Sequence, residues 1–205
     1  MLLASLAIAG CNGGDDHART TPLTLVPATA AGAATTPAGS RDYRNPAWGI
    51  DLRFPSQWVA DPHYRADFGE VPDTYESPGG RAAGFVKVDA ANAPSLSYAV
   101  DSIAHHKLKP YGETPIIDQV SLPAGDGVLV LPDPASPQLT EAALAMPFPE
   151  ALRAVAPIAA GYPYLLIFAQ ARDIRAIADS LRFLDPASAV LPDSPPRSST
   201  ATATP

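Results

Sequence analysis

Two adjacent histidines, His105 and His106, come closest in type and spacing to a chemical site. Asp101 precedes His105 by four residues, so on a helix its carboxylate and the first imidazole share a face, as metal ligands often do. Adjacent helical residues, however, point about 100° apart and cannot easily hold one ion. No second ligand pair spaced as HxxxH is present. We therefore predict no metal site, and interpret both histidines as partly exposed residues near a helix end, where positive charge is mildly favourable.

The run KLKPYG, residues 107–112, follows directly. It could form a contact surface, since it offers two cations and an aromatic ring at the end of a helix. Pro110 and Gly112 could equally end the helix and turn the chain, with Tyr111 packed beneath it. The sequence leaves both alternatives open. The residues of the possible contact surface are His105, His106, Lys107, Lys109 and Tyr111.

Catalytic chemistry finds little support in the sequence. There is no GxSxG motif, and no serine stands in a recognisable frame with a histidine. GDG at 125–127 and SPGG at 77–80 are interpreted as turns, because neither is followed by the Lys-Ser/Thr start of a phosphate-binding helix. We predict no catalytic residue, and a protein that is not an enzyme.

Residues 1–11, MLLASLAIAGC, are too short an apolar run to span a membrane, which takes about 20 residues. Ile8 to Cys11 resemble the lipobox of bacterial lipoproteins, although no Lys or Arg precedes the run, so we expect the true start codon upstream. The resemblance implies a signal peptide cut before Cys11 and a covalent diacylglycerol on its sulfur. We predict no other cofactor. It also implies a lipid anchor in the cell membrane, facing the extracytoplasmic side. Cys11 is the only cysteine, so no disulfide forms within the chain.

The aromatic residues define the domain organisation. All 15 lie between Tyr43 and Phe183, and a core cannot form without large apolar side chains. We predict a signal peptide at 1–11, a flexible Ala/Thr/Pro/Gly linker at 12–41, one folded and monomeric domain at 42–184, and a disordered tail at 185–205. The net charge of −7 and the absence of any basic run argue against nucleic acid as a partner.

Within the domain, hydrophobic periodicity predicts one antiparallel sheet covered by helices, an α+β fold. We expect a strand at 50–54, a hairpin through Gly79-Gly80, a helix from Ser95 ended by Pro110, and a hairpin that turns at GDG. Further along, 142–146 is a strand, 150–155 is either a helical turn or a strand, 164–169 is the central strand, and a helix capped by Asp173 runs to Leu184.

Three segments resemble PsbP-like and Mog1-like domains. They are YRNPAWGIDLRFPSQW at 43–58, AHHKLKPYG at 104–112 and IADSLRFL at 177–184. The resemblance implies an α/β/α sandwich used as a non-enzymatic binding or assembly module that recognises a protein or an envelope component. The alternative is a small-ligand or metal-binding lipoprotein that uses the His105 and His106 region. Residues 132–160 depart from any pattern we recognise in these domains.

Overall fold

The computed structural model describes residues 39–61 and 72–188, and all statements below concern these ranges. Their strands are β1 Ser40–Asn45, β2 Ile50–Pro55, β3 Val59–Ala60, β4 Thr74–Glu76, β5 Phe85–Ala91, β6 Ile116–Leu122, β7 Gly125–Leu131, β8 Glu141–Pro147, β9 Tyr164–Gln170 and β10 Arg182–Phe183. Their α-helices are α1 Leu96–Ala104, α2 Glu150–Arg153, α3 Pro157–Gly161 and α4 Ala171–Ser180. Short 3-10 helices occupy Arg81–Ala83 and Pro186–Ser188.

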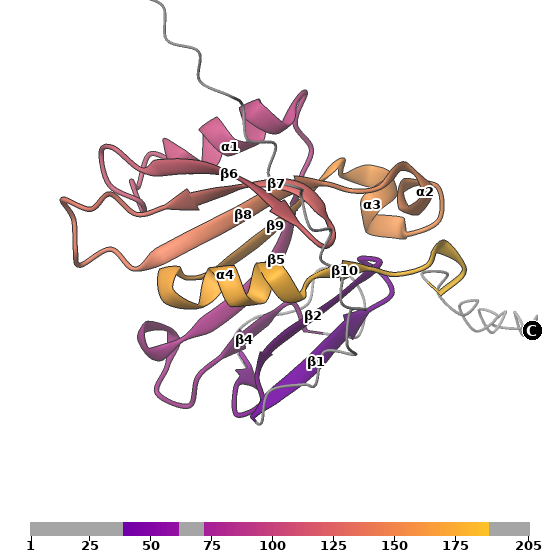
Figure 1. Cartoon of the computed structure of the whole chain (residues 1–205), viewed down its shortest axis with the longest axis horizontal. Coiled ribbons are helices and arrows are strands. Elements are labelled where there is room, and N and C mark those ends of the chain that lie inside the picture. Colours follow the sequence, from indigo (N-terminus) through magenta and orange to yellow (C-terminus); the bar gives the residue numbers. More distant parts are fainter. Residues whose placement is uncertain (1–38, 62–71, 189–205) are drawn as a thin grey trace, which may run out of the picture. The chain divides into compact units, whose positions relative to one another are not determined.

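Seven of these strands form one antiparallel sheet in the order β3-β4-β5-β9-β8-β7-β6 (Figure 1). The apolar run of β9 lies at its centre, paired with β5 on one side and β8 on the other, so the predicted central strand is confirmed. The strand at 142–146 and the hairpin of β4 and β5 are also confirmed. Residues 150–153 are helical, which settles the alternative left open there.

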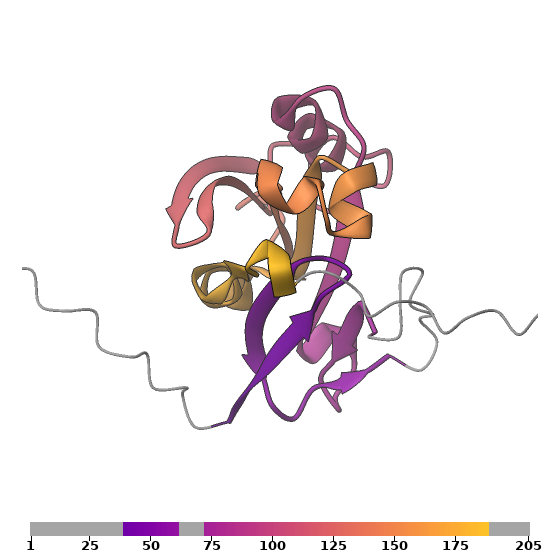
Figure 2. The same ribbon diagram turned by 90° about the vertical axis from the view of Figure 1, so that its right-hand side faces the viewer.

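The two faces of this sheet carry separate apolar clusters. In β9, Leu165 and Ile167 belong to one cluster, whereas Leu166 and Phe168 belong to the other, because successive strand side chains point to opposite faces. Helix α1 packs on β7 and β8 on the side of Leu166, and α4 packs on β8 and β9 on the other (Figures 1 and 2). The predicted α+β class, an antiparallel sheet covered by helices, is therefore confirmed.

Helix α1 lies on small side chains. Ala143 and Ala145 of β8 are fully buried in its cluster, together with Val100 and Ala104 of the helix itself. Ser95 caps this helix, since its hydroxyl accepts a hydrogen bond from the amide of Tyr98 at 3.1 Å. The capping role expected of Ser95 is thus present, but the helix ends at Ala104, well before Pro110.

A second sheet contradicts the expectation of a single one. It has the order β1-β2-β10, and β2 buries Ile50, Leu52 and Phe54 while Asp51 and Arg53 stay partly exposed, as the alternation predicted. This strand pairs with residues more than 130 positions away in sequence, namely Arg182 and Phe183 of β10. Periodicity shows that a strand is half-buried, but it carries no information on which sheet the strand joins.

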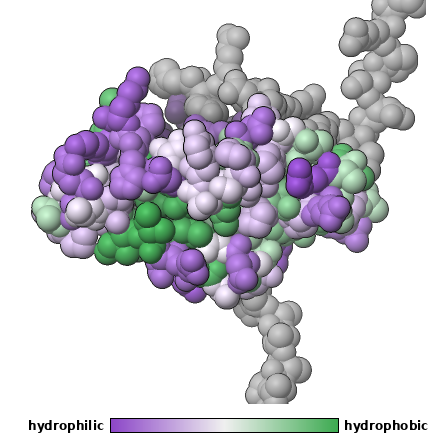
Figure 3. Space-filling model, turned by 90° about the horizontal axis from the view of Figure 1, so that it is seen from above, coloured by the Kyte–Doolittle hydropathy of each residue, from purple (hydrophilic) through white to green (hydrophobic). Residues whose placement is uncertain are grey.

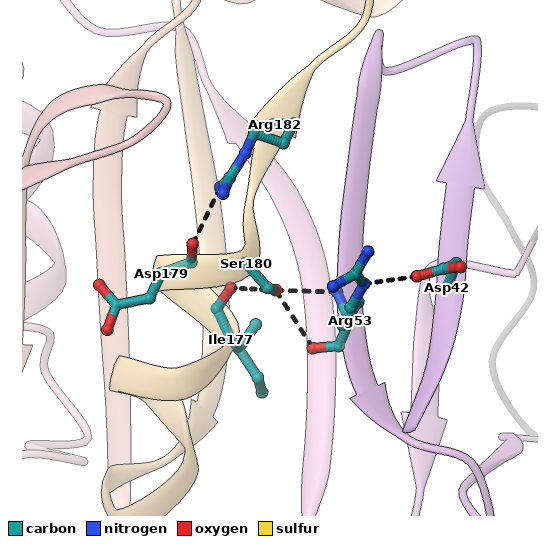
Figure 4. A network of polar contacts seen from close by, with 6 residues as sticks. All are labelled: Asp42, Arg53, Ile177, Asp179, Ser180 and Arg182. Atoms are coloured by element: carbon teal, nitrogen blue, oxygen red, sulfur yellow. Dashed lines mark hydrogen bonds and ion pairs between the residues drawn. The ribbon is translucent and has the colours of Figure 1, made fainter. Parts of the chain in front are cut away.

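Polar contacts connect the smaller sheet to α4 (Figure 4). The amide of Arg53 donates to Ser180 Oγ at 2.9 Å, and that hydroxyl donates to the carbonyl of Ile177 at 2.6 Å. Arg53 Nε also donates to Asp42 Oδ1 at 2.7 Å across β1 and β2. Ser180 therefore ends α4 and fixes its last turn against β2.

The predicted last helix is wrong at both ends. It begins at Ala171 with no side-chain cap, so Asp173 is not its N-cap, and it ends at Ser180 rather than at Leu184. Leu181 has φ −58° and ψ 136°, which is extended backbone, and the chain then continues as β10. Leu181 and Leu184 are both buried, so their spacing looked helical although the segment that carries them is not.

The hairpin predicted to turn at GDG, residues 125–127, is present, but its turn lies at other residues. β6 and β7 pair in continuous register from Ile116 with Leu131 to Leu122 with Gly125, so the turn lies at Pro123 and Ala124 and GDG belongs to the strand. An added Cβ at Gly127 would be crowded, because it would stand 3.2 Å from the carbonyl of Ala145. Close approach of β8, rather than a turn, therefore accounts for this glycine.

The described fold extends slightly beyond the predicted boundaries. Ser40 and Arg41, assigned to the linker, belong to β1, and Pro186–Ser188 forms a helical turn where a tail was expected. The predicted signal peptide, Cys11, and the remainder of both predicted tails lie outside the described residues. Within residues 39–61 and 72–188, no helix combines the length and apolar character needed to cross a membrane.

Candidate functional site

The residues predicted as a contact surface all follow the C-terminus of α1. His105 caps the helix, its amide donating to the carbonyl of Asp101 at 2.9 Å, and both histidines are exposed. His105 Nε2 lies 3.7 Å from Asp101 Oδ1, while His106 Nδ1 accepts a hydrogen bond from the amide of Leu108 at 3.3 Å. Across the described residues, no three His, Cys, Asp or Glu side chains come together as metal ligands.

Tyr111 does not belong to this surface. It is 1% exposed and packs beneath α1 with Val100, Val130 and Ala143. Burial, and secondarily the carboxylate of Glu141, raises the pKa of its hydroxyl far above the ordinary value. The inclusion of Tyr111 in the contact surface was wrong. The alternative, in which this side chain anchors the turn, is the one that the structure shows.

A buried carboxylate holds the remainder of the turn. Asp133 accepts hydrogen bonds from the amide and hydroxyl of Thr114, at 3.2 and 2.9 Å, and from the amide of Ala135 at 2.8 Å. The Ala135 amide, followed by Thr114, lowers the pKa of this carboxyl below its ordinary value. Asp133 also donates its own amide to the carbonyl of Tyr111 at 2.8 Å. The segment after α1 is therefore held in place by the hydrogen bonds of Asp133 and by the buried ring of Tyr111.

The tip of the turn exposes an aliphatic side chain between two cations. Leu108 is 77% exposed, the highest value among the large apolar side chains of the described residues. Lys109, whose φ is 47°, donates to both carboxylate oxygens of Glu113 at 2.5 and 2.6 Å. Lys107 is exposed and makes no ion pair with any described residue. The tip therefore exposes Lys107 and Lys109 on either side of Leu108, and whether it is a contact surface stays a prediction.

Ile116 and Ile117, at the start of β6, are 44% and 50% exposed. They face opposite sides of the sheet, because Ile116 pairs with Leu131 and Ile117 with Val130, which belong to opposite apolar clusters. Seen from above, the described part of the molecule has an apolar area bordered by polar surface, in which Figure 3 labels no residue. We call the exposed residues of the turn after α1 and of the start of β6 the 105–117 surface. They are His105, His106, Lys107, Leu108, Lys109, Ile116 and Ile117.

Sequence reasoning did not assign the two isoleucines to a site. A hydrophobic pair at the start of a strand normally indicates burial, and only the strand order shows that β6 stands at the edge of the sheet. The available signal was the polar character of the remainder of β6, in which Asp118, Gln119 and Ser121 are all exposed. A strand with so few buried positions is typical of an edge.

A shallow hollow of about 370 Å³ lies elsewhere, between the first 3-10 helix and the start of β8. Its charged groups are already paired, since Arg81 Nη2 lies 3.1 Å from Glu141 Oε2 and its guanidinium lies 3.5 Å from the centre of the Phe85 ring. Gln170 donates its side-chain amide to the carbonyl of Arg81 at 3.0 Å. These groups are bonded to one another and do not converge on the space, as those of a built ligand site do.

Taken together, the fold and the site define an α+β domain that exposes an apolar and basic surface at one edge of its sheet. Among solved structures, it is similar to the solution structure of cyanobacterial PsbP (CyanoP) from Synechocystis sp. PCC 6803, with 11% sequence identity and a TM-score of 0.40. That likeness covers 78% of this chain and 98% of that one, and at this level it carries no information about activity. No family model matches the chain, and no curated protein matches it either.

Proposed function

We propose that the chain is a lipid-anchored, extracytoplasmic binding or assembly module that is not an enzyme and recognises a protein or an envelope component through the 105–117 surface. The observation that carries this proposal is the exposure of Leu108, Ile116 and Ile117 within ten residues. Soluble proteins expose single apolar side chains routinely, whereas several large apolar side chains exposed at one edge of a sheet are typical of interaction sites.

The rigidity of the turn supports the same function. Tyr111 and Asp133 hold it from beneath, so the exposed side chains are presented in one arrangement before a partner arrives. A preorganised surface loses less conformational entropy on binding than a flexible one, which favours affinity.

The lipid anchor is supported by the sequence alone. Ile8, Ala9, Gly10 and Cys11 have the spacing of a lipobox, and Cys11 is the only cysteine of the chain. Two acyl chains would hold the protein stably on a bilayer, since each buried methylene contributes about 0.8 kcal/mol and one chain alone binds only marginally. We therefore place the protein at the cell membrane on its extracytoplasmic side.

Photo-crosslinking tests the binding function. A crosslinking amino acid replaces Leu108 in one variant and Ala176, exposed on α4 on the opposite face of the sheet, in the control. In membranes of the producing cells, the variant at 108 is expected to give a discrete adduct that the control lacks. Equal labelling from both positions, or no adduct from position 108, would contradict the proposal.

Mass spectrometry of the N-terminus tests the anchor. The protein is expressed with its upstream region, and the mature chain is expected to begin at a diacylated Cys11. A Cys11→Ser variant, expressed in parallel, should remain uncut and leave the membrane fraction. An unmodified, uncut Cys11 in the parent protein would reject the anchor without affecting the binding proposal.

A further inference from the structure

We infer that the edge of β6 accepts a strand from a partner protein, and that this strand carries aliphatic residues flanking a Lys or Arg. The inference rests on the proposed binding function and names the mode and chemistry of recognition. Four observations lead to it: the geometry of the edge, the two-faced apolar surface, the unpaired carboxylate of Asp118, and the contrast with the opposite edge of the same sheet.

The edge of β6 is long and regular. All seven of its residues pair with β7 in unbroken register, so no bulge twists the strand away. As the last strand in the sheet order, β6 directs alternate backbone N–H and C=O groups away from β7. The strand contains no Lys, Arg or Pro, which natural edges often use to block added strands, and its one charged residue is Asp118.

The opposite edge of the sheet is different. There, β3 contains only Val59 and Ala60, which is too short to template an additional strand. The short strand β3 thus protects its edge of the sheet, whereas β6 provides seven residues with which an added strand could pair. Any strand addition to this sheet is expected at β6.

The exposed isoleucines favour a strand over other occupants. Ile116 and Ile117 face opposite sides of the sheet, so a helix or a membrane surface that lies on one face would cover only one of them. An added strand extends both faces at once, and its successive side chains pack beside both isoleucines. Their exposures are similar, 44% and 50%, as expected for a pair that one partner covers together.

Asp118 determines the charge of the partner. Its side chain is exposed in the middle of β6 and has no ion-pair partner among the described residues. A Lys or Arg directly opposite would stabilise the added strand, whereas a like charge would oppose it. The net charge of −7 on the whole chain acts in the same direction.

The same carboxylate disfavours a second copy of this chain. Because β6 has no cation, no register of self-pairing can neutralise Asp118. In an antiparallel pair centred on Gln119, the two Asp118 side chains would lie diagonally across one face, about 7–8 Å apart at the backbone, where like charges repel. The occupant is therefore a strand of a different, basic sequence.

The test uses the full chain and a designed peptide, acetyl-TTVTKIVTG-amide, whose lysine faces Asp118 when its Ile and Val face Ile117 and Ile116. We expect saturable binding by calorimetry and slower hydrogen exchange confined to 116–122. Asp118→Lys should weaken binding about five- to tenfold, while the peptide with Glu in place of Lys should prefer that variant. Glu150→Lys, an equal charge change on exposed α2, should leave the affinity within twofold.

Several results would overturn the inference. These are absence of saturable peptide binding, protection of another strand, and equal effects of Asp118→Lys and Glu150→Lys. Concentration-dependent dimers that protect 116–122 would assign the edge to a second copy, and protection by anionic phospholipid vesicles alone would assign it to lipid. If the crosslinking variant at position 108 still gives its adduct when Ile117→Lys is added, the binding function stands and strand addition is rejected. If the variant at position 108 gives no adduct without that substitution, both are rejected.

Discussion

The hydroxyl of Tyr111 is buried without a hydrogen-bond partner among the described residues. An unpaired buried donor costs about 1–3 kcal/mol, so Tyr111→Phe is expected to raise the free energy of unfolding by about 1 kcal/mol. Tyr111→Ala, which also removes the ring beneath α1, should lower it by about 3–5 kcal/mol. Urea unfolding at pH 7 measures both. A Phe variant less stable than the parent would show that the hydroxyl has a partner.

The carboxyl of Asp133 makes stability dependent on acid pH. Its folded pKa lies below the ordinary value of 3.8, chiefly because the Ala135 amide and then Thr114 donate to the ionised form. A depressed folded pKa contributes stability that is fully present above about pH 4 and is lost as the pH falls through the folded value. Asp133→Asn should therefore have a lower urea midpoint than the parent at pH 7, and the difference should shrink toward pH 3.

The control for this prediction is Asp126→Asn, since Asp126 is exposed and its carboxylate accepts a hydrogen bond from Ser121 of the same hairpin. Its urea midpoint is expected to follow that of the parent at every pH. If the difference between Asp133→Asn and the parent stayed constant from pH 7 to pH 3, the titration of Asp133 could not be its cause.

For individual residues, the sequence predicted which side chains follow α1 better than it predicted which of them are buried. Exposed histidines and lysines at the end of α1 follow from the helical pattern and from Pro110 and Gly112. Whether Tyr111 is displayed or buried depends on the space between α1 and β7, which no local pattern encodes. The same limit applies to Asp133, which lies in the proline-rich segment and bonds to residues about 20 positions away.

Among the elements, the turn after α1 depends on Gly112. This residue has φ +88°, and an added Cβ would stand 2.6 Å from Asp133 Cβ. Gly112→Ala is expected to destabilise the protein by about 2 kcal/mol or more, because it combines backbone strain with displacement of the carboxylate. Thermal unfolding measures the effect, and the same variant should weaken partner binding through the 105–117 surface.

A matched variant separates this effect from the general cost of changing a glycine. Gly161 lies at the end of α3, has no positive φ, and an added Cβ would meet nothing within 4 Å. Gly161→Ala should therefore alter stability by less than about 0.5 kcal/mol. Similar losses in both variants would remove the special role assigned to Gly112.

The elements show where periodicity succeeds and where it fails. β9 and β7 were predictable because their short apolar runs are rich in β-branched or aromatic residues and lie close to glycine or proline, which favours buried strands. The end of α4 was not, since Leu181 and Leu184 are buried at a spacing that fits a helix, yet Arg182 and Phe183 pair with β2. That pairing depends on residues more than 130 positions away, and local sequence does not report it.

For the molecule as a whole, β9 is the element that both faces of the larger sheet share. Ile167 is fully buried at its centre, so Ile167→Ala should lower the free energy of unfolding by about 2–5 kcal/mol. Because the strand contributes to both apolar clusters, we expect a single cooperative transition, with fluorescence and far-UV circular dichroism coinciding. Val155→Ala, at an exposed site, should change stability by less than about 0.5 kcal/mol. Two separate transitions in the Ile167 variant would contradict this.

The alanines of β8 have a consequence for recognition. Ala143 and Ala145 set the height at which α1 rests above the sheet, because larger side chains there would push the helix outward. The turn that displays Leu108 leaves directly from α1, whereas Ile117 belongs to the sheet. Two small residues with no access to solvent thus act as spacers between the tip of the turn and the sheet edge. Larger side chains at positions 143 and 145 would move the turn relative to the sheet edge. They would thereby change which ligands fit, although neither position contacts a ligand.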